Sequence, residues 1–190
     1  MRLLSRVLSA VNKVIFLILF NIANSIDLRY CCSATISIYP ERLRNRALKE
    51  LGMQIGDDSW IRSSFYAVNF SNIIIGRHSK VGPFSQIWSY GLVVIGDCTE
   101  IGSSLIIHTS EHLYNDVNAP IVKQGSSIQA VTVGNNVYIG SRVTILPGVT
   151  INDNTIVAAG AVVTRNLPSG YIYAGVPAKP IKSLPSRNEA

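Results

Sequence analysis

The sequence predicts an all-β solenoid, because apolar residues recur at every sixth position through most of the chain beyond residue 52. A period of six fits neither the 3.6-residue period of a helix nor the two-residue alternation of a half-buried strand. Short strands that each send one large aliphatic side chain inward would stack these residues into a continuous buried column. The runs that carry the period are Ile75, Val81, Ile87 and Val93; Ile95, Ile101 and Ile107; and Val133, Ile139, Ile145, Ile151, Val157 and Val163.

Small residues mark the corners of the predicted solenoid. A glycine often follows the apolar residue directly, as at Gly76, Gly96 and Gly134. Four residues after the apolar position the side chain is usually small or β-branched. Glycine suits such corners because it adopts backbone conformations that other residues avoid.

The repeat changes register at two places. The step from Val93 to Ile95 is two residues, and the step from Ile107 to Val133 is two residues longer than four repeats. The polar segment 108–130 is therefore predicted to project from the solenoid as an inserted loop. Loops on rigid scaffolds are common positions for catalytic residues.

The chain divides into three predicted parts: an N-terminal helical, apolar segment at 1–51, a solenoid at 52–175 and a basic tail at 176–190. Within the first part, residues 41–51 have the apolar spacing of a helix. Pro40 stands at a helix-start position, and Gly52 follows as a C-terminal stop.

The unbroken apolar run at 14–20 allows three interpretations. It could be the centre of a secretory signal. It could belong to a membrane-spanning helix, although Lys13, Asn21 and Asn24 interrupt the roughly 20 apolar residues that a span needs. It could also be an amphipathic helix that packs on the protein or lies on a membrane. The last interpretation is favoured by apolar residues at helical spacing, namely Leu4, Val7, Leu8, Val11 and Ile15.

Composition limits the possible partners. The 190 residues suit one domain, and 47% apolar with only 15% charged residues, against about 25% in average proteins, excludes a disordered polar chain. The net charge of +6 is scattered in clusters and forms no long basic stripe with aromatic residues, so nucleic acid is not expected as a partner. An anionic small ligand or a membrane surface suits such clusters better. The three cysteines give no disulfide framework, which favours a reducing, cytoplasmic location.

The three histidines differ in their surroundings. His78 occupies an ordinary repeat corner and is expected to be an exposed structural residue. His108 opens the inserted loop, in an orienting or a filling role. His112, inside the loop, is the candidate general base, because a neutral imidazole can accept a hydroxyl proton at neutral pH. Three histidines could also bind zinc. However, the HxxxH spacing of His108 and His112 is one residue short of the HxxxxH pair in gamma-class carbonic anhydrases, so no metal is expected.

The ordered combination of motifs resembles the hexapeptide-repeat acyltransferases, in the branch of sugar O-acetyltransferases that includes the maltose, galactoside and surface-polysaccharide enzymes. The resemblance covers roughly residues 52–182. It rests on the repeat, the loop ending in TSEH, the segment GNNVYIGSRVTILPGVTI and the closing AAGAVVTRNLPSGYIYAGVPAKPIK. It implies a left-handed parallel β-helix, a homotrimer, acetyl-CoA as donor and active sites in clefts between subunits.

The same resemblance assigns roles to residues that match the family's motifs. His112 falls at the position of the catalytic histidine. Four residues fall where the family lines the pantetheine and thioester channel, with plain coil packing as the alternative for Tyr138, Ala159 and Thr164. Two lysines fall where relatives place basic residues against the CoA phosphates, with a solvated tail as the alternative. These residues are Tyr138, Ser141, Ala159 and Thr164 for the channel, and Lys179 and Lys182 for the phosphates.

One position departs from the family's pattern. Galactoside-type relatives have an acceptor-binding asparagine where this chain has Gly82. Contacts to the acceptor are therefore expected from Trp88, Ser89 and Tyr90, at the first register change. An aromatic ring such as Trp88 can stack on a sugar face, and it can equally belong to the core.

These observations lead to one main hypothesis and three alternatives. The main hypothesis is direct acetyl transfer from acetyl-CoA to a sugar hydroxyl of a bacterial surface polysaccharide or its precursor. His112 would act as base, Glu111 or Asp116 could orient it, and a backbone N–H near Ser141 would hold the oxyanion. The alternatives are N-acetylation of an amino sugar, a gamma-carbonic-anhydrase-like metal hydratase and a catalytically silent solenoid. The apolar N-terminus further suggests a lipid-linked acceptor, reached by peripheral contact with the cytosolic face of a membrane.

Overall fold

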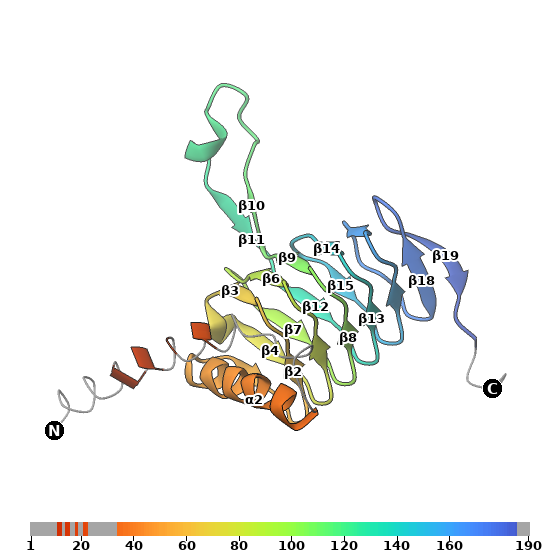
Figure 1. Cartoon of the computed structure of the whole chain (residues 1–190). Helices are drawn as coiled ribbons and strands as arrows, with labels where there is room; N and C mark the ends of the chain where they lie inside the picture. Colours follow the sequence, from red (N-terminus) through yellow and green to blue (C-terminus); the bar gives the residue numbers. More distant parts are fainter. Residues whose placement is uncertain (1–10, 13, 16–17, 19–20, 23–33, 186–190) are drawn as a thin grey trace.

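The structure is a computed structural model that describes residues 11–12, 14–15, 18, 21–22 and 34–185. Its body is a parallel β-helix with three sheets, and a helix lies against one end of it (Figure 1). The first sheet contains β1 (Gln54–Ile55), β4 (Ile73–Ile75), β7 (Val93–Ile95), β12 (Val131–Val133) and β15 (Thr150–Ile151). The second contains β2 (Trp60–Ile61), β5 (Lys80–Val81), β8 (Glu100–Ile101), β13 (Tyr138–Ile139), β16 (Ile156–Val157), β18 (Tyr171–Ala174) and β19 (Lys179–Ser183). The third contains β3 (Tyr66–Val68), β6 (Gln86–Trp88), β9 (Ile106–His108), β14 (Thr144–Ile145) and β17 (Val162–Val163).

The predicted column of aliphatic residues is the core of this β-helix. Equivalent residues of successive coils lie in register on parallel strands, as Ile75 does with Ile95 and Ile139 with Val157. All members of the three six-residue runs are buried. The prediction of an all-β solenoid is therefore confirmed.

The first register change is a longer corner and not a break in the column. Val93 and Ile95 both point inward because they occupy alternate positions of the single strand β7. Ile95 pairs with Ile75, twenty positions earlier, whereas Ile151 pairs with Val133, only eighteen positions earlier. The early coils thus carry two extra residues, and these lie in the corner between the third and the first sheet.

The second register change is a projecting β-hairpin, as the sequence predicts. Strand β10 (Ser110–His112) pairs antiparallel with β11 (Ser126–Ile128), and a short 3-10 helix, η3 (Ile121–Lys123), lies in the connection between them. Figure 1 shows this hairpin standing away from the β-helix. Its two ends join the strands β9 and β12 of successive coils.

The helix α2 (Ala34–Glu50) covers the N-terminal end of the β-helix. Asn45 Nδ2 donates to the carbonyl oxygen of Ser59 over 2.6 Å, which ties the helix to the first coil. The helix begins six residues before the predicted start, so the placement of Pro40 at the helix start was wrong. A proline inside a helix removes one backbone hydrogen bond, and here that loss does not end the helix.

The predicted stop at Gly52 is confirmed. Gly52 has a φ of 108°, which favours glycine, and its N–H donates to the Lys49 carbonyl over 3.0 Å. The Met53 N–H donates to the Leu48 carbonyl over 3.0 Å. These two bonds satisfy the last carbonyl groups of the helix in the usual glycine-terminated pattern.

The C-terminal segment differs from the predicted basic tail. Residues Lys179–Ser183 form β19, which pairs antiparallel with β18 and extends the second sheet. The Leu184 N–H also donates to the Gly170 carbonyl over 2.8 Å. Up to residue 185 the segment is therefore part of the β-helix end, and only residues 186–190 lie outside the described residues.

Most of the apolar N-terminal segment lies outside the described residues. Those that are described are helical, and five of their apolar side chains are about half exposed: Val11, Val14, Ile15, Ile18 and Ile22. Among the described residues, no helix is long and apolar enough to cross a membrane.

Candidate active site

His112 lies at the base of the projecting hairpin, as the last residue of β10. Its side chain is exposed, and its cross-strand neighbour on β11 is Ser126. The Ser126 Oγ lies 3.3 Å from His112 Nδ1. Ser126 thus lies at one nitrogen of the imidazole, and the rest of the ring is exposed to solvent, as a proton-accepting group requires.

The two acids that the sequence suggests as orienting groups are placed differently. Glu111 precedes His112 in the same strand, so the two side chains point to opposite faces of the hairpin. The Asp116 Oδ1 accepts a hydrogen bond from the Asn118 N–H over 2.9 Å. In the part of the chain that is described, no ion pair joins either acid to His112.

Trp88 belongs to a ladder of rings on the outer face of the third sheet. The Tyr66 and Trp88 ring centroids lie 5.2 Å apart, and the His108 ring stacks on Trp88 at 6.1 Å with an interplanar angle of 11°. Neighbouring rings thus occupy both sides of Trp88. The expectation that a sugar stacks on the face of Trp88 therefore does not suit this geometry, although the residue is partly exposed.

Ser89 and Tyr90 lie in the long corner after β6 and differ in exposure. Ser89 is fully buried, and its hydroxyl donates to the Val68 carbonyl. Its own carbonyl oxygen accepts from Asn69 and Asn72. The expectation that Ser89 contacts the acceptor is wrong for this conformation, because the side chain is inside the coil. Tyr90 is half exposed and remains available.

Hydrogen bonds link successive coils along the corner that follows the second sheet, and this ladder ends at Ser141. The Ser103 N–H donates to Ser141 Oγ of the next coil over 3.2 Å, and the two hydroxyl oxygens lie 3.1 Å apart. The register that pairs Ile139 with Val157 places Ala159 in the corresponding position after Ser141, and alanine has no hydroxyl. Among the described residues, no hydrogen bond of the Ser141 N–H is formed. The corner therefore presents one unpaired backbone donor.

Tyr138 and Ala159 are exposed beside this corner. Tyr138 lies on the outer face of β13 and is 50% exposed, and Ala159 follows β16 one coil later. Thr164 is exposed at the end of β17. The predicted channel residues are thus on the surface, whereas coil packing would bury them.

A pocket of about 640 Å³ lies at the C-terminal end of the β-helix, between the corner after β17 and the strands β18 and β19. Arg165 and Lys179 are the charged residues that line it, and no carboxylate does. Tyr171 and Tyr173 give it an aromatic wall, with the Tyr173 hydroxyl donating to the Pro168 carbonyl over 2.9 Å. Burial raises the pKa of this phenol above its usual value. Lys182 is exposed on β19 outside this pocket.

Arg165 was not a predicted site residue. Its signal in the sequence is its position directly after Thr164, within a motif that the resemblance already covers. Only the fold shows that it shares a pocket with Lys179, because the two lie on separate elements of the C-terminal end.

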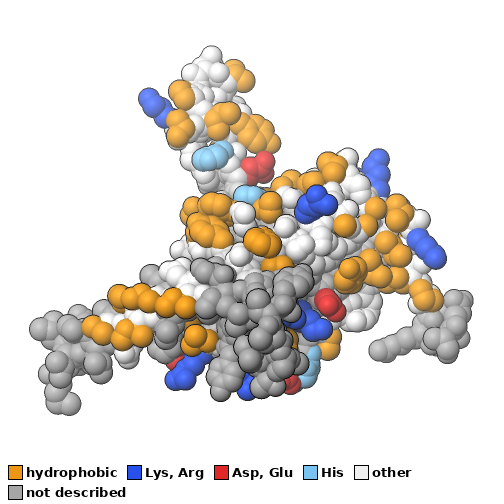
Figure 2. All heavy atoms as spheres, in the orientation of Figure 1, with side chains coloured by type: hydrophobic (Ala, Val, Ile, Leu, Met, Phe, Trp, Pro, Cys, Tyr) orange, Lys and Arg blue, Asp and Glu red, His pale blue; other side chains and the backbone are white. Residues whose placement is uncertain are grey.

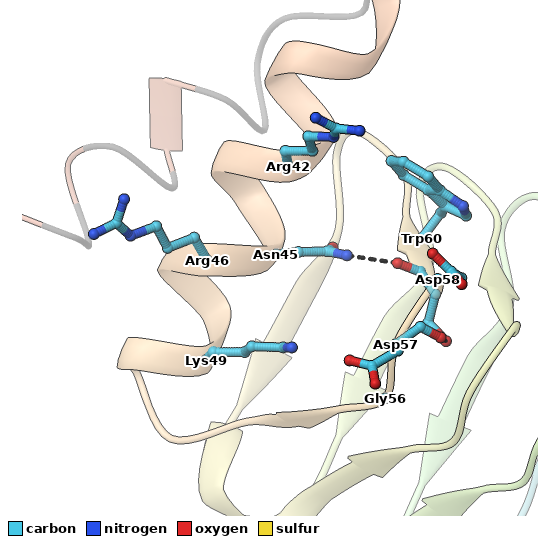
Figure 3. Close-up of a pocket in the computed structure, with 9 residues that line it drawn as sticks. Arg42, Asn45, Arg46, Lys49, Gly56, Asp57, Asp58 and Trp60 are labelled. Atoms are coloured by element: carbon cyan, nitrogen blue, oxygen red, sulfur yellow. Dashed lines mark hydrogen bonds between the residues drawn. The ribbon is translucent and has the colours of Figure 1, made fainter.

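A smaller pocket of about 330 Å³ lies between α2 and the turn before β2 (Figure 3). Arg42 and Lys49 of the helix face a turn that carries Asp57 and Asp58, and the bond from Asn45 to Ser59 crosses between them. Charges of both signs thus meet across this pocket. We assign it a structural role in holding α2 on the first coil.

Two points about the histidines remain: the role of His78 and the possibility of a metal site. His78 Nδ1 lies 3.7 Å from the Asp58 carboxylate on an exposed corner, as expected for a structural residue. Within the described ranges, no group of three possible metal ligands occurs.

Comparisons with known proteins agree with this geometry. Residues 130–165 match the family described as bacterial transferase hexapeptide (six repeats). The galactoside O-acetyltransferase of Escherichia coli K12 is 34% identical over 147 residues, which cover 77% of this chain and 71% of that protein. The chain belongs to the hexapeptide-repeat acetyltransferases. The resemblance inferred from the sequence is confirmed.

Solved structures of such acetyltransferases share the fold. A galactoside acetyltransferase in complex with coenzyme A has a TM-score of 0.73 and 27% identity, covering 95% of this chain and 84% of that one. A hexapeptide-repeat acetyltransferase of Vibrio cholerae complexed with acetyl coenzyme A has a TM-score of 0.74 and 25% identity, covering 88% and 84%. As a hexapeptide-repeat acetyltransferase, the chain is an acetyl-CoA-dependent enzyme.

Proposed function

We propose that this acetyltransferase moves the acetyl group of acetyl-CoA to a sugar hydroxyl, in one step and without a covalent enzyme intermediate. The observation that carries the proposal is that the chain offers two complementary groups, a proton acceptor and a hydrogen-bond donor. His112 is an exposed imidazole on a projecting hairpin, and the Ser141 N–H is an unpaired donor where a hydrogen-bond ladder ends. A base and an oxyanion donor are the two groups that acyl transfer from a thioester needs.

In this mechanism, His112 Nε2 accepts the proton of the sugar hydroxyl as its oxygen attacks the thioester carbonyl. The carbonyl oxygen gains negative charge and accepts a hydrogen bond from the Ser141 N–H. When the carbon–sulfur bond breaks, the imidazolium returns the proton to the leaving sulfur. The products are the acetyl ester and free coenzyme A.

The donor would lie along the coils towards the pocket at the C-terminal end. Arg165 and Lys179 offer two cations with no opposing carboxylate, which suits the phosphates of coenzyme A. Tyr171 and Tyr173 offer an aromatic wall for the adenine. Tyr138, Ala159 and Thr164 are exposed on the later coils of the β-helix and would contact the pantetheine, and Lys182 would add charge near the phosphates.

The active site would be formed by two copies of the chain in a homotrimer. In the described part of one chain, no hydrogen bond, ion pair or ring contact joins His112 to the Ser141 corner. The hairpin also exposes apolar side chains that a single chain leaves uncovered (Figure 2). The largest are Tyr114, Val117, Ile121, Val122 and Ile128.

Subunit mixing tests this arrangement. At an acetyl-CoA concentration well below the wild-type KM, His112→Ala should be nearly inactive alone, and the double variant Arg165→Glu/Lys179→Glu should lose most of its activity because its KM is raised. Co-expressed in one trimer, they should regain activity, because the intact His112 of one copy can face the intact donor surface of the other. Activity that stays absent in mixed trimers of normal mass would contradict a shared site.

The acceptor would be a sugar of a surface polysaccharide or its precursor. The relatives include a protein named as a putative lipopolysaccharide biosynthesis O-acetyl transferase, from Escherichia coli K12, at 32% identity. The test is release of coenzyme A from acetyl-CoA with matched hydroxyl and amino sugars. If only amino groups are acetylated, the proposed O-acetylation is wrong and the enzyme is an N-acetyltransferase.

The enzyme would work in the cytoplasm, in peripheral contact with the membrane. The half-exposed residues Val11, Val14, Ile15, Ile18 and Ile22 have the spacing of one helix face. In sedimentation with anionic phospholipid vesicles, the double variant Ile15→Glu/Ile18→Glu should lose binding, whereas Asn12→Glu, off this face, should keep it. Equal binding of both variants would contradict a membrane role for this face.

A further inference from the structure

Among the described residues, the side chain that lies within hydrogen-bond distance of the His112 imidazole is Ser126. The register of the hairpin sets this contact. Ser110 lies opposite Ile128, Glu111 opposite Ser127 and His112 opposite Ser126. Directly opposed side chains of an antiparallel pair project to the same face, so His112 and Ser126 are neighbours in any hairpin with this register.

We propose that Ser126 is the positioning residue of His112. Its Oγ accepts a hydrogen bond from Nδ1–H and thereby keeps Nε2 unprotonated, facing the acceptor hydroxyl. The inference rests on the proposed role of His112 as base. It replaces the carboxylate that the sequence suggested, because Glu111 points to the other face and Asp116 binds the Asn118 N–H.

The direction of this hydrogen bond decides whether His112 can act. A neutral imidazole carries one proton, and the nitrogen without it is the base. If the serine donated to Nδ1, the ring proton would sit on Nε2, which could then accept nothing. If the serine accepts from Nδ1–H, the same bond persists when Nε2 takes up the substrate proton, because both nitrogens of an imidazolium are donors. Only the accepting arrangement suits both states of the reaction.

A hydroxyl also differs from a carboxylate in charge. A carboxylate beside an imidazole stabilises the imidazolium and so retains the proton that must later reach the leaving sulfur. A serine oxygen orients the ring without adding a negative charge. The hairpin therefore supports a neutral base whose orientation is fixed by the strand register.

The first test compares variants of the full-length enzyme. Ser126→Ala should lower kcat by about fivefold, since one hydrogen bond contributes roughly 1 kcal/mol, while the KM for acetyl-CoA stays unchanged. Ser126→Thr should restore most of the loss. Ser127→Ala is the matched control, because the same residue type on the same strand faces away and pairs with Glu111. Ser126→Asp should move the acid limb of the pH profile of kcat/KM to higher pH.

The second test reads the ring directly. Nitrogen-15 NMR of histidine-labelled protein should show His112 with its proton on Nδ1 in the wild type and a mixture of tautomers in Ser126→Ala. A wild-type proton on Nε2, or unchanged tautomer and kcat in Ser126→Ala, would overturn the inference. Full activity of His112→Ala would instead overturn the proposed function, so the two failures are distinguishable.

Discussion

His112 is the residue whose replacement tests the chemistry most directly. His112→Ala should lower kcat by about 10²- to 10⁴-fold, the usual contribution of a general base. The oligomeric mass, the thermal unfolding midpoint and the affinity for coenzyme A should remain those of the wild type, because the side chain is exposed on the hairpin. Steady-state kinetics and calorimetric titration measure both effects.

The matched control is His78→Asn, at an exposed histidine in a corner of the β-helix. His78 has a φ of 55°, a conformation that asparagine tolerates, so this variant should fold and keep its turnover. A loss of activity equal to that of His112→Ala would show that the effect is not specific to the hairpin.

Asp97 makes stability depend on pH. Its pKa lies below the usual value, first because its Oδ1 accepts the Arg77 backbone N–H at 2.7 Å and then because the Arg77 guanidinium bonds to it. A carboxyl with a lowered folded-state pKa stabilises the fold above its unfolded pKa of about 3.9, and this contribution is lost as the pH falls through the folded pKa. The unfolding midpoint of wild type should therefore drop more steeply below pH 4 than that of Asp97→Asn, in thermal unfolding followed by circular dichroism. Parallel curves for the two proteins would contradict this role.

Some site residues could be predicted from the sequence, and others could not. His112 and Ser141 stand in motifs that a single sequence displays. Ser126 could not be paired with His112, because the contact depends on the register of a hairpin whose two partners are fourteen positions apart in the sequence. Ser89 was misassigned because sequence alone does not show which side of a corner faces inward.

Some corners of the β-helix bring the backbone of successive coils into close approach. A Cβ at Gly82 would overlap the carbonyl oxygen of Gly102 in the next coil. Gly82→Ala should thus lower the free energy of unfolding by about 2 kcal/mol or more, since backbone of two coils would have to separate. Gly160→Asn is the control, because its Cβ meets nothing within 4 Å and its φ of 74° suits asparagine. Urea unfolding compares the two, and equal stability would contradict the close approach at Gly82.

This tight corner also gives a physical reason for the departure from the family's pattern. The family resemblance implies an asparagine at the position of Gly82, and this chain has no room there for a side chain in its present coil spacing. Tyr90, in the corner after β6, is half exposed and remains a candidate for contact with the acceptor.

At the scale of elements, the six-residue period predicted coils of the β-helix but not the extent of the elements at its two ends. The six-residue column fixes which residues face inward, so the coils from Ile75 to Val163 could be placed from sequence. The extent of α2 could not, because a helix that packs on the first coil continues across Pro40. The sequence predicted a tail at 176–190 because this segment has no periodic apolar pattern. The pattern is absent because β19 is exposed along its whole length.

At the scale of the whole molecule, the pockets at the two ends of the β-helix differ in charge, and this difference predicts how the protein binds its donor. The pocket at the C-terminal end has two cations and no carboxylate, whereas the pocket under α2 combines both signs. Reversing the charges in Arg165→Glu/Lys179→Glu should raise the KM for acetyl-CoA at least about tenfold, since a charge-assisted hydrogen bond contributes about 1.5 kcal/mol or more. The value of kcat should change little, because the phosphates are bound equally in the ground and transition states.

The control for net charge is Arg42→Glu/Lys49→Glu, the same change in charge at the opposite end of the β-helix. This variant should leave the KM for acetyl-CoA near the wild-type value. Added salt should raise the KM of the wild type and of this control more than that of Arg165→Glu/Lys179→Glu, because screening acts on an attraction that the latter has lost. An equal rise of KM in both double variants would mean that the overall positive charge, and not this pocket, attracts the donor.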